Sequence, residues 1–186
     1  MVKGKGKKRR CVRMPIQVPR SGGNFDPCPE GDFTAVLVDI VDLGMVTSEK
    51  FKKTQPKVML AFQVDQLDEK GLPFLVFKRY TNSLHEKATL HGDLKRWLGK
   101  QFDVKALQKD LEILLGRGAR LEIVQNEGSD GKVYSNIDRI RPLAADQKGP
   151  TAHPDFTRKK DRAEGQGPFG KHGKASDPDE GPEIDF

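Results

Sequence analysis

The sequence VMLAFQVDQLDEKGLPFLVFKRYT occupies residues 58–81 and contains two alternating segments on either side of a turn. In the first segment the apolar side chains Val58, Leu60, Phe62 and Val64 recur at every second position, which is the period of a β-strand. The residues from Asp68 to Gly71 have the composition of a turn, and residues 74–81 are again apolar and β-branched or aromatic. The stretch therefore predicts a β-hairpin.

The segments on both sides of this hairpin extend the β pattern. Residues 33–41 predict an earlier strand, which a polar, Lys-rich loop over residues 44–56 joins to the hairpin. After the hairpin, apolar residues recur at spacings of three and four from Leu84 to Leu98 and again over residues 104–115, as in amphipathic helices. The period then returns to two over residues 119–123 and 133–139, which predict two further strands around a turn.

The predicted order is three strands, a helical insertion and two strands. A mainly β, five-stranded OB-fold barrel has this order, with its helix between strands 3 and 4. An open five-stranded α+β sheet is the structural alternative, because the sequence does not reveal whether a barrel closes. We expect a single domain over residues 30–143, which is within the usual size range.

Two tails of opposite charge flank this domain, although the net charge of the chain is +6. Residues 1–29 predict a basic flexible arm, because positions 1–20 carry eight Lys or Arg residues and no acid. Residues 144–175 predict a disordered linker rich in Gly, Pro and Lys, with Phe156 and Phe169 as its only large apolar residues. Residues 176–186 form an acidic tip that contains five acids and no base.

Several classes of protein do not fit this sequence. It has no apolar run long enough to cross a membrane and no secretory signal, so we expect a cytoplasmic location, the host cytoplasm if a phage encodes the chain. Cys11 and Cys28 stand apart from any metal-binding pattern and are expected to be free thiols. The common enzyme motifs for phosphate binding, nucleophilic serine and zinc are missing. We therefore predict no catalytic activity, no metal site and no cofactor.

Basic and aromatic side chains are concentrated on the elements with which an OB-fold binds nucleic acid, namely the first loop, the third strand and the last hairpin. Aromatic rings stack on unpaired bases for about 1–3 kcal/mol each, and Lys and Arg contact the phosphates. The candidate nucleic-acid-binding residues are Lys50, Phe51, Lys52, Lys53, Lys57, Phe77, Lys78, Arg79, Tyr80, Lys132, Tyr134, Arg139 and Arg141.

Alternation along the third strand separates its aromatic residues into two sets. Tyr80 shares a face with Phe74 and Val76, and Phe77 lies on the opposite face, so one set belongs to the core. We favour Tyr80 and Tyr134 as groove residues because tyrosine hydroxyls prefer a hydrated edge. Trp97 lies on the apolar helical stripe and is expected in the core.

The strand order and the tail together resemble the small OB-fold single-stranded DNA-binding proteins, and residues 30–143 resemble those of bacteriophages. In the bacterial family the acidic tail ends in Ile-Pro-Phe, and here the chain ends in Ile184-Asp185-Phe186. The resemblance implies a protein of DNA replication, recombination and repair whose tail recruits partner enzymes. It implies a partner-binding set of Asp179, Glu180, Glu183, Ile184, Asp185 and Phe186.

The residues leave two other functions open beside sequence-tolerant binding and protection of single-stranded DNA. One is an RNA-binding OB protein, since stacking and phosphate contacts do not distinguish the sugars. The other is an adaptor whose basic face binds an acidic protein surface. The oligomeric state also stays open, a homo-oligomer included, as do the site size and the identity of the tail's partners.

Overall fold

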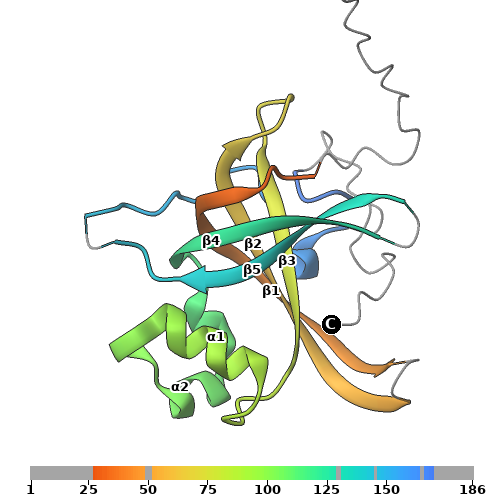
Figure 1. The fold of residues 1–186 in the computed structure, drawn as a ribbon, viewed down its shortest axis with the longest axis vertical. Helices are drawn as coiled ribbons and strands as arrows, with labels where there is room; N and C mark the ends of the chain where they lie inside the picture. Colours follow the sequence, from red (N-terminus) through yellow and green to blue (C-terminus); the bar gives the residue numbers. More distant parts are fainter. Residues whose placement is uncertain (1–26, 49–51, 129–130, 145, 164–165, 170–186) are drawn as a thin grey trace, which may run out of the picture.

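The computed structural model describes residues 27–48, 52–128, 131–144, 146–163 and 166–169. Its strands are β1 (Gly31–Ser48), β2 (Lys53–Leu67), β3 (Pro73–Thr81), β4 (Gly118–Glu127) and β5 (Val133–Arg141). They form a five-stranded antiparallel sheet in the spatial order β3-β2-β1-β4-β5 (Figure 1). The predictions of a mainly β protein and of this order of elements along the chain are confirmed.

The central strand β1 is long and belongs to both halves of the sheet. Residues 31–36 pair with β4, and the pairing with β2 runs from Ala35 to Ser48. A register shift between Leu37 and Asp39 marks a bulge at which the partners of β1 change. At this bulge Leu37 donates its N–H to Arg117 O and accepts a hydrogen bond from Gly116 N. The backbone of β1 thus stays hydrogen-bonded at the bulge, to the two residues that precede β4.

The predicted loop over residues 44–56 is wrong, because β1 and β2 continue as a two-stranded ribbon. Residues 44–48 pair with residues 53–57, and the Thr47 and Thr54 hydroxyls lie 2.8 Å apart. We call these two segments the ribbon; it extends away from the other strands at the lower right of Figure 1. Polar residues suit a ribbon that is hydrated on both faces, so their composition resembles that of a loop.

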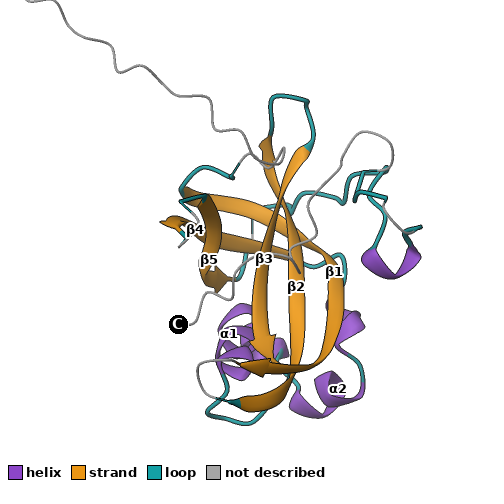
Figure 2. Cartoon of the chain, turned by 90° about the vertical axis from the view of Figure 1, so that its right-hand side faces the viewer, coloured by secondary structure: helices purple, strands orange, loops and turns teal. Residues whose placement is uncertain are grey.

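The helices between β3 and β4 lie together at one end of the sheet (Figures 1 and 2). Helix α1 (Thr89–Leu98) begins later than its periodicity predicts. The second helical segment divides into α2 (Val104–Lys109) and a 3-10 turn, η2 (Leu111–Leu114). The division occurs at Asp110, whose carboxylate accepts the N–H of Glu112 and so caps a new turn. A further 3-10 turn, η1 (Gly99–Gln101), follows α1.

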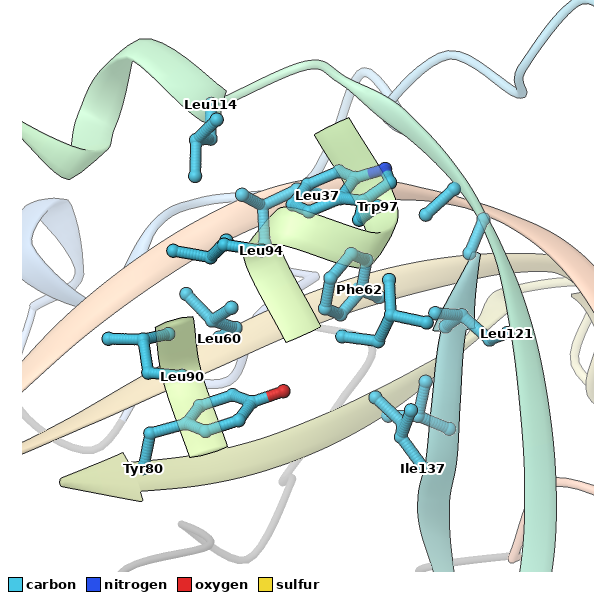
Figure 3. Close-up of a cluster of buried hydrophobic side chains, with 14 of the residues drawn as sticks. Leu37, Leu60, Phe62, Tyr80, Leu90, Leu94, Trp97, Leu114, Leu121 and Ile137 are labelled. Carbon is cyan, nitrogen blue, oxygen red and sulfur yellow. The ribbon is translucent and has the colours of Figure 1, made fainter. Parts of the chain in front are cut away.

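The main core lies between the sheet and α1, on what we call the inner face of the sheet (Figure 3). Phe62 from β2 meets Trp97 from α1 edge to face, with the ring centroids 5.7 Å apart. The Trp97 Nε1–H donates to Gly118 O over 2.9 Å, so the indole is satisfied although it is buried. The prediction that Trp97 belongs to the core is confirmed.

The edge strands β3 and β5 approach each other across the inner face. Lys78 Nζ donates to Asp138 O over 3.0 Å, and α1 contacts both strands. The described residues form no backbone ladder between β3 and β5, so the architecture is an open five-stranded antiparallel sheet with a helix between β3 and β4.

The described residues after β5 do not match the expected disordered linker over residues 144–175. Residues 149–163 and 166–169, which we call the strap, cross the other side of β1, β2 and β3, which we call the outer face. Phe169 and Phe156 pack there with Val36, Val38, Ala61, Leu75 and Phe77. The strap contains the 3-10 turn η3 (Lys159–Asp161), which lies beside β1 (Figure 2). Two aromatic rings and a preformed apolar surface provide the burial that composition alone does not reveal.

Candidate nucleic-acid interface

The strand register defines which side chains share the outer face. Ala61 pairs with Asp39 on one side and Phe77 on the other, and the next outward position of β2, Met59, pairs with Val41 and Arg79. Lys57 follows, opposite Thr81. Alternation along β2 then places Gln55 and Lys53 on the same face, toward the tip of the ribbon.

This arrangement divides the outer face into two parts of different chemistry. The part near Ala61 is apolar and lies under the strap. The other part carries the exposed Arg79 and Lys53 and the half-buried Lys57, and the exposed Lys52 immediately precedes β2. Among the described residues none of these four cations takes part in an ion pair. Lys57 Nζ only donates a 3.4 Å hydrogen bond to Thr81 Oγ1. Three of the predicted site residues therefore share this face, and Lys52 is next to them in the sequence.

Phe77 lies on the outer face of β3, opposite the face of Tyr80, but it is only partly exposed. It packs against the cluster that contains Phe169 and Ala61. An aromatic ring in that position is close to Arg79, two residues along the same strand, and is partly shielded from solvent by the cluster to which the strap contributes Phe169. The structure thus keeps Phe77 on the predicted face and covers it.

Tyr80 and Lys78 face inward, contrary to the prediction for both. Tyr80 is buried, and its hydroxyl donates to Asp93 Oδ2 of α1 over 2.8 Å. Lys78 Nζ lies 3.0 Å from the same carboxylate, and Arg96 binds the other oxygen. Burial, with the neighbouring Asp93 carboxylate, raises the pKa of the Tyr80 hydroxyl above its ordinary value. The hydrated edge expected for Tyr80 is replaced by a buried acid.

The two arginines of the last hairpin are largely neutralised by acids. Arg141 binds Glu122, and Arg139 lies 3.9 Å from Glu122 and 3.4 Å from Asp138. Asp32 is shared between Arg120 and Arg141 at 3.5 and 4.0 Å. Cations held by acids have less charge to offer a phosphate. These two arginines of the predicted site therefore lie on the surface, but in a network of ion pairs that neutralises their charge.

The other predicted residues of this hairpin are Lys132, which is exposed before β5, and Tyr134, which is half-buried opposite Asn126. The remaining predictions lie outside the described residues. They concern Lys50 and Phe51, which lie between β1 and β2 in the sequence, and Asp179, Glu180, Glu183, Ile184, Asp185 and Phe186 of the acidic tip.

Polar contacts hold the strap on β1 and β2. Asp39 accepts the Arg158 Nε–H over 2.9 Å and the Lys159 backbone N–H over 2.7 Å. Gln63 Oε1 accepts the His153 backbone N–H over 2.7 Å. Both Asp39 and Gln63 are buried, so the strap satisfies polar atoms that would otherwise lie in an apolar surface.

Glu112 of η2 forms the outer part of the same attachment. Arg158 Nη2 lies 2.6 Å and Lys160 Nζ 3.1 Å from Glu112 Oε1. The hydrogen bond from Arg158, followed by that from Lys160, lowers the pKa of Glu112 from 4.5 to about 2. The bond to Glu112 in turn raises the pKa of Arg158. We call Asp39, Glu112 and Arg158 the latch.

Sequence reasoning missed the latch. Two features of the sequence could have indicated the latch. One is an acid inside an apolar strand, Asp39, and the other is the basic run Arg158-Lys159-Lys160 in a segment with no clear hydrophobic pattern. An unpaired acid in a buried strand requires a cation from elsewhere in the fold. Asp39 and Arg158 are more than a hundred residues apart, so the sequence alone does not show that they meet.

Comparison with known proteins gives no family for this chain, since no family model matches it and no curated protein is significantly similar to it. Within the described residues there is no cluster of three His, Cys, Asp or Glu side chains that could hold a metal ion. The described part of the chain also contains no helix with the length and hydrophobicity of a membrane span.

Proposed function

We propose that this protein binds single-stranded DNA without strong sequence preference, along the cationic part of its outer face. The observation that carries the proposal is the group formed by Lys52, Lys53, Lys57 and Arg79, none of which has an acid partner among the described residues. Three of these cations lie along one face, with Lys52 next to them in the sequence, and form a track for a flexible backbone of phosphates.

The arrangement of the elements supports an OB-fold as the finer description of this sheet. The strand order brings β3 and β5 to opposite edges, and Lys78 Nζ reaches the Asp138 carbonyl across the gap between them. Helix α1 contacts both edges, at the position of the helix that an OB-fold carries between strands 3 and 4. OB-folds bind oligonucleotides over strands 2 and 3, which here carry Lys57 and Arg79.

The test is fluorescence anisotropy of a labelled oligo-dT and of its duplex equivalent over a salt series, with the intact chain. We expect preference for the single strand and an affinity that falls with salt, because bound cations release counterions from the phosphates. Lys53→Glu combined with Lys57→Glu should weaken binding and lower the salt slope by about 0.7 for each phosphate that the variant no longer binds.

A matched control changes charge by the same amount on another surface. Lys95→Glu combined with Lys100→Glu alters two exposed lysines at the helical end of the molecule. Equal loss of affinity in both double variants would show that net charge alone governs binding, and would contradict a site on the outer face. Equal affinity for duplex and single strand would contradict the proposed function itself.

Matched oligo-dT and oligo-rU probes in the same experiment distinguish DNA from RNA binding. The acidic tip belongs to the same proposal as a peptide that recruits replication and recombination proteins. Its terminal Phe186 supplies one apolar anchor and its acids supply a salt-sensitive attraction. Truncation before Ser176 should tighten binding to oligo-dT, because it removes five acids that compete with the phosphates.

A further inference from the structure

The strap covers the one aromatic side chain that the described outer face offers for base stacking. Phe77 pairs with Ala61 across the ladder and packs in the cluster that contains Phe169. Arg79 lies two residues further along β3 and is exposed. A base that stacked on Phe77 would therefore have its phosphate near Arg79, as single-strand binding requires, but only if the strap had moved.

The attachment of the strap is of a kind that can open locally. Among the described strap residues only Gly167 takes part in a β-bridge, and the backbone N–H groups of His153 and Lys159 bind side chains. Thr157 N donates to Pro168 O over 2.8 Å, which closes the strap on itself rather than on the sheet. A segment with few apolar anchors and little strand pairing belongs to the least stable part of a fold.

The latch stabilises the strap in its docked position on the sheet. When the strap is docked, the Asp39 carboxylate is only 3% exposed and has Arg158 as its cation. When the strap leaves, this carboxylate loses both its cation and the Lys159 N–H. An uncovered Asp39 would repel phosphate, so a nucleic acid that displaced the strap would lie toward β3, where Phe77 and Arg79 are, and away from β1.

We propose that the strap is an autoinhibitory cover, and that single-stranded nucleic acid must displace it from Phe77 to bind the outer face with full affinity. The inference rests on the proposed function and concerns its regulation by the strap, a different segment from the acidic tip. The apparent affinity is then the intrinsic affinity reduced by the fraction of molecules in which the strap is open.

Glu112→Gln tests the cover without touching the proposed DNA-binding residues. It removes the ion pairs of Arg158 and Lys160 from an exposed side chain of η2. Its matched control is Glu86→Gln, which removes the same charge from an exposed residue before α1 and, among the described residues, breaks no hydrogen bond or ion pair with the strap. We expect Glu112→Gln to bind oligo-dT about two- to fivefold more tightly than Glu86→Gln, since an exposed ion pair contributes a small part of the closing energy.

Limited digestion with trypsin reports the strap position directly, because it cleaves after Arg158, Lys159 and Lys160. We expect Glu112→Gln to be cleaved there faster than Glu86→Gln, and saturating oligo-dT to accelerate this cleavage in the unmodified chain. Phe77→Ala should show fast cleavage without tighter binding, since it releases the strap and removes the ring that the strap covers.

Three results would overturn the cover. The first is equal affinity of Glu112→Gln and Glu86→Gln for oligo-dT. The second is protection of the strap from trypsin by oligo-dT, which would make the strap part of the binding surface. In both cases a preserved preference for single strands would leave the proposed function standing. The third is the loss of any single-strand preference in the unmodified chain, which overturns function and cover together.

Discussion

Arg158 and Asp39 are 119 positions apart in the sequence, yet the Arg158 Nε–H donates to Asp39 Oδ1 over 2.9 Å. The pair joins the strap to the central strand of the sheet. The Asp39 side chain is 3% exposed and that of Arg158 is 19% exposed, so neither charge is well hydrated. An acid in this position is tolerated because the strap supplies its cation.

We expect Arg158→Gln to lower the free energy of unfolding by roughly 2 kcal/mol, because it leaves Asp39 covered without a cation. The value lies below that for a fully buried pair since Arg158 is partly hydrated. Urea unfolding followed by the fluorescence of Trp97 measures it. Adding Asp39→Asn should recover part of the loss, and strict additivity of the two changes would contradict a direct ion pair. Lys109→Gln, an exposed change on α2, serves as the control.

The strap should loosen as the pH falls from about 4.5 toward 2. Glu112 has a folded-state pKa of about 2, below its ordinary 4.5, so its contribution is complete above pH 4.5 and is lost as the pH falls through the folded value. Hydrogen exchange of the His153 and Lys159 amides over this range measures the opening. Glu112→Gln should remove this part of the pH dependence. An unchanged profile in that variant would show that other groups control the strap at low pH.

Cys28 should react slowly with thiol reagents in the folded protein. It is buried, and burial, followed by the nearby Asp65 carboxylate, raises the pKa of its thiol from 9.0 to about 11. In a Cys11→Ser variant, which leaves one thiol, we expect reaction with a disulfide reagent at pH 8 to become fast only on unfolding. Fast reaction under native conditions would contradict the burial.

The same shift of Cys28 has a consequence for stability. Because the folded-state pKa is raised, the protonated thiol favours the folded state below pH 9, and this preference is lost as the pH rises from 9 through about 11. A Cys28→Ala variant should therefore lose less stability than the unmodified chain between these two pH values. Urea midpoints at pH 8 and pH 10.5 provide the measurement.

Tyr80→Phe and Arg79→Gln should have opposite effects, although the two residues are adjacent. Tyr80→Phe removes a hydroxyl that donates to the buried Asp93 and should cost about 1–2 kcal/mol of stability, with little change in the affinity for oligo-dT. Arg79→Gln changes an exposed cation on the outer face and should weaken binding with little change in stability. Reduced DNA affinity in folded Tyr80→Phe would contradict the assignment of β3's inner face to the core.

Periodicity was sufficient to predict the order of the elements, because each strand and helix presents its own apolar face. It failed for the ribbon, since residues 44–48 and 53–57 have no buried face and therefore no hydrophobic alternation to detect. It also failed at Asp110, where a single capping carboxylate ends one helical segment and begins another. Such features depend on backbone pairing and local hydrogen bonds, and these leave little trace in the pattern of apolar residues along the sequence.

The candidate site shows the same limit at the level of side chains. Alternation correctly separated Tyr80 from Phe77, but the choice of the inward face depended on Asp93, an acid from α1 that accepts the Tyr80 hydroxyl. The strap was not predicted because Phe156 and Phe169 do not belong to a periodic pattern of apolar residues. The surface that they cover comes from strands much earlier in the sequence. The structure places Lys53, Lys57 and Arg79 on the outer face, and their role in binding nucleic acid stays a prediction.

The pairing of β1 with both β2 and β4 has a consequence for synthesis on the ribosome, where the chain emerges from its N-terminus. Strands β2 and β3 can join β1 soon after they appear, but residues 31–36 must wait for β4, and the outer face near Ala61 waits longer still for residues 149–169. A nascent chain that stops before the strap exposes Val36, Val38 and Leu75 to its neighbours. Synthesis of the strap, rather than the pairing of strands, is then the event that covers this apolar part of the outer face.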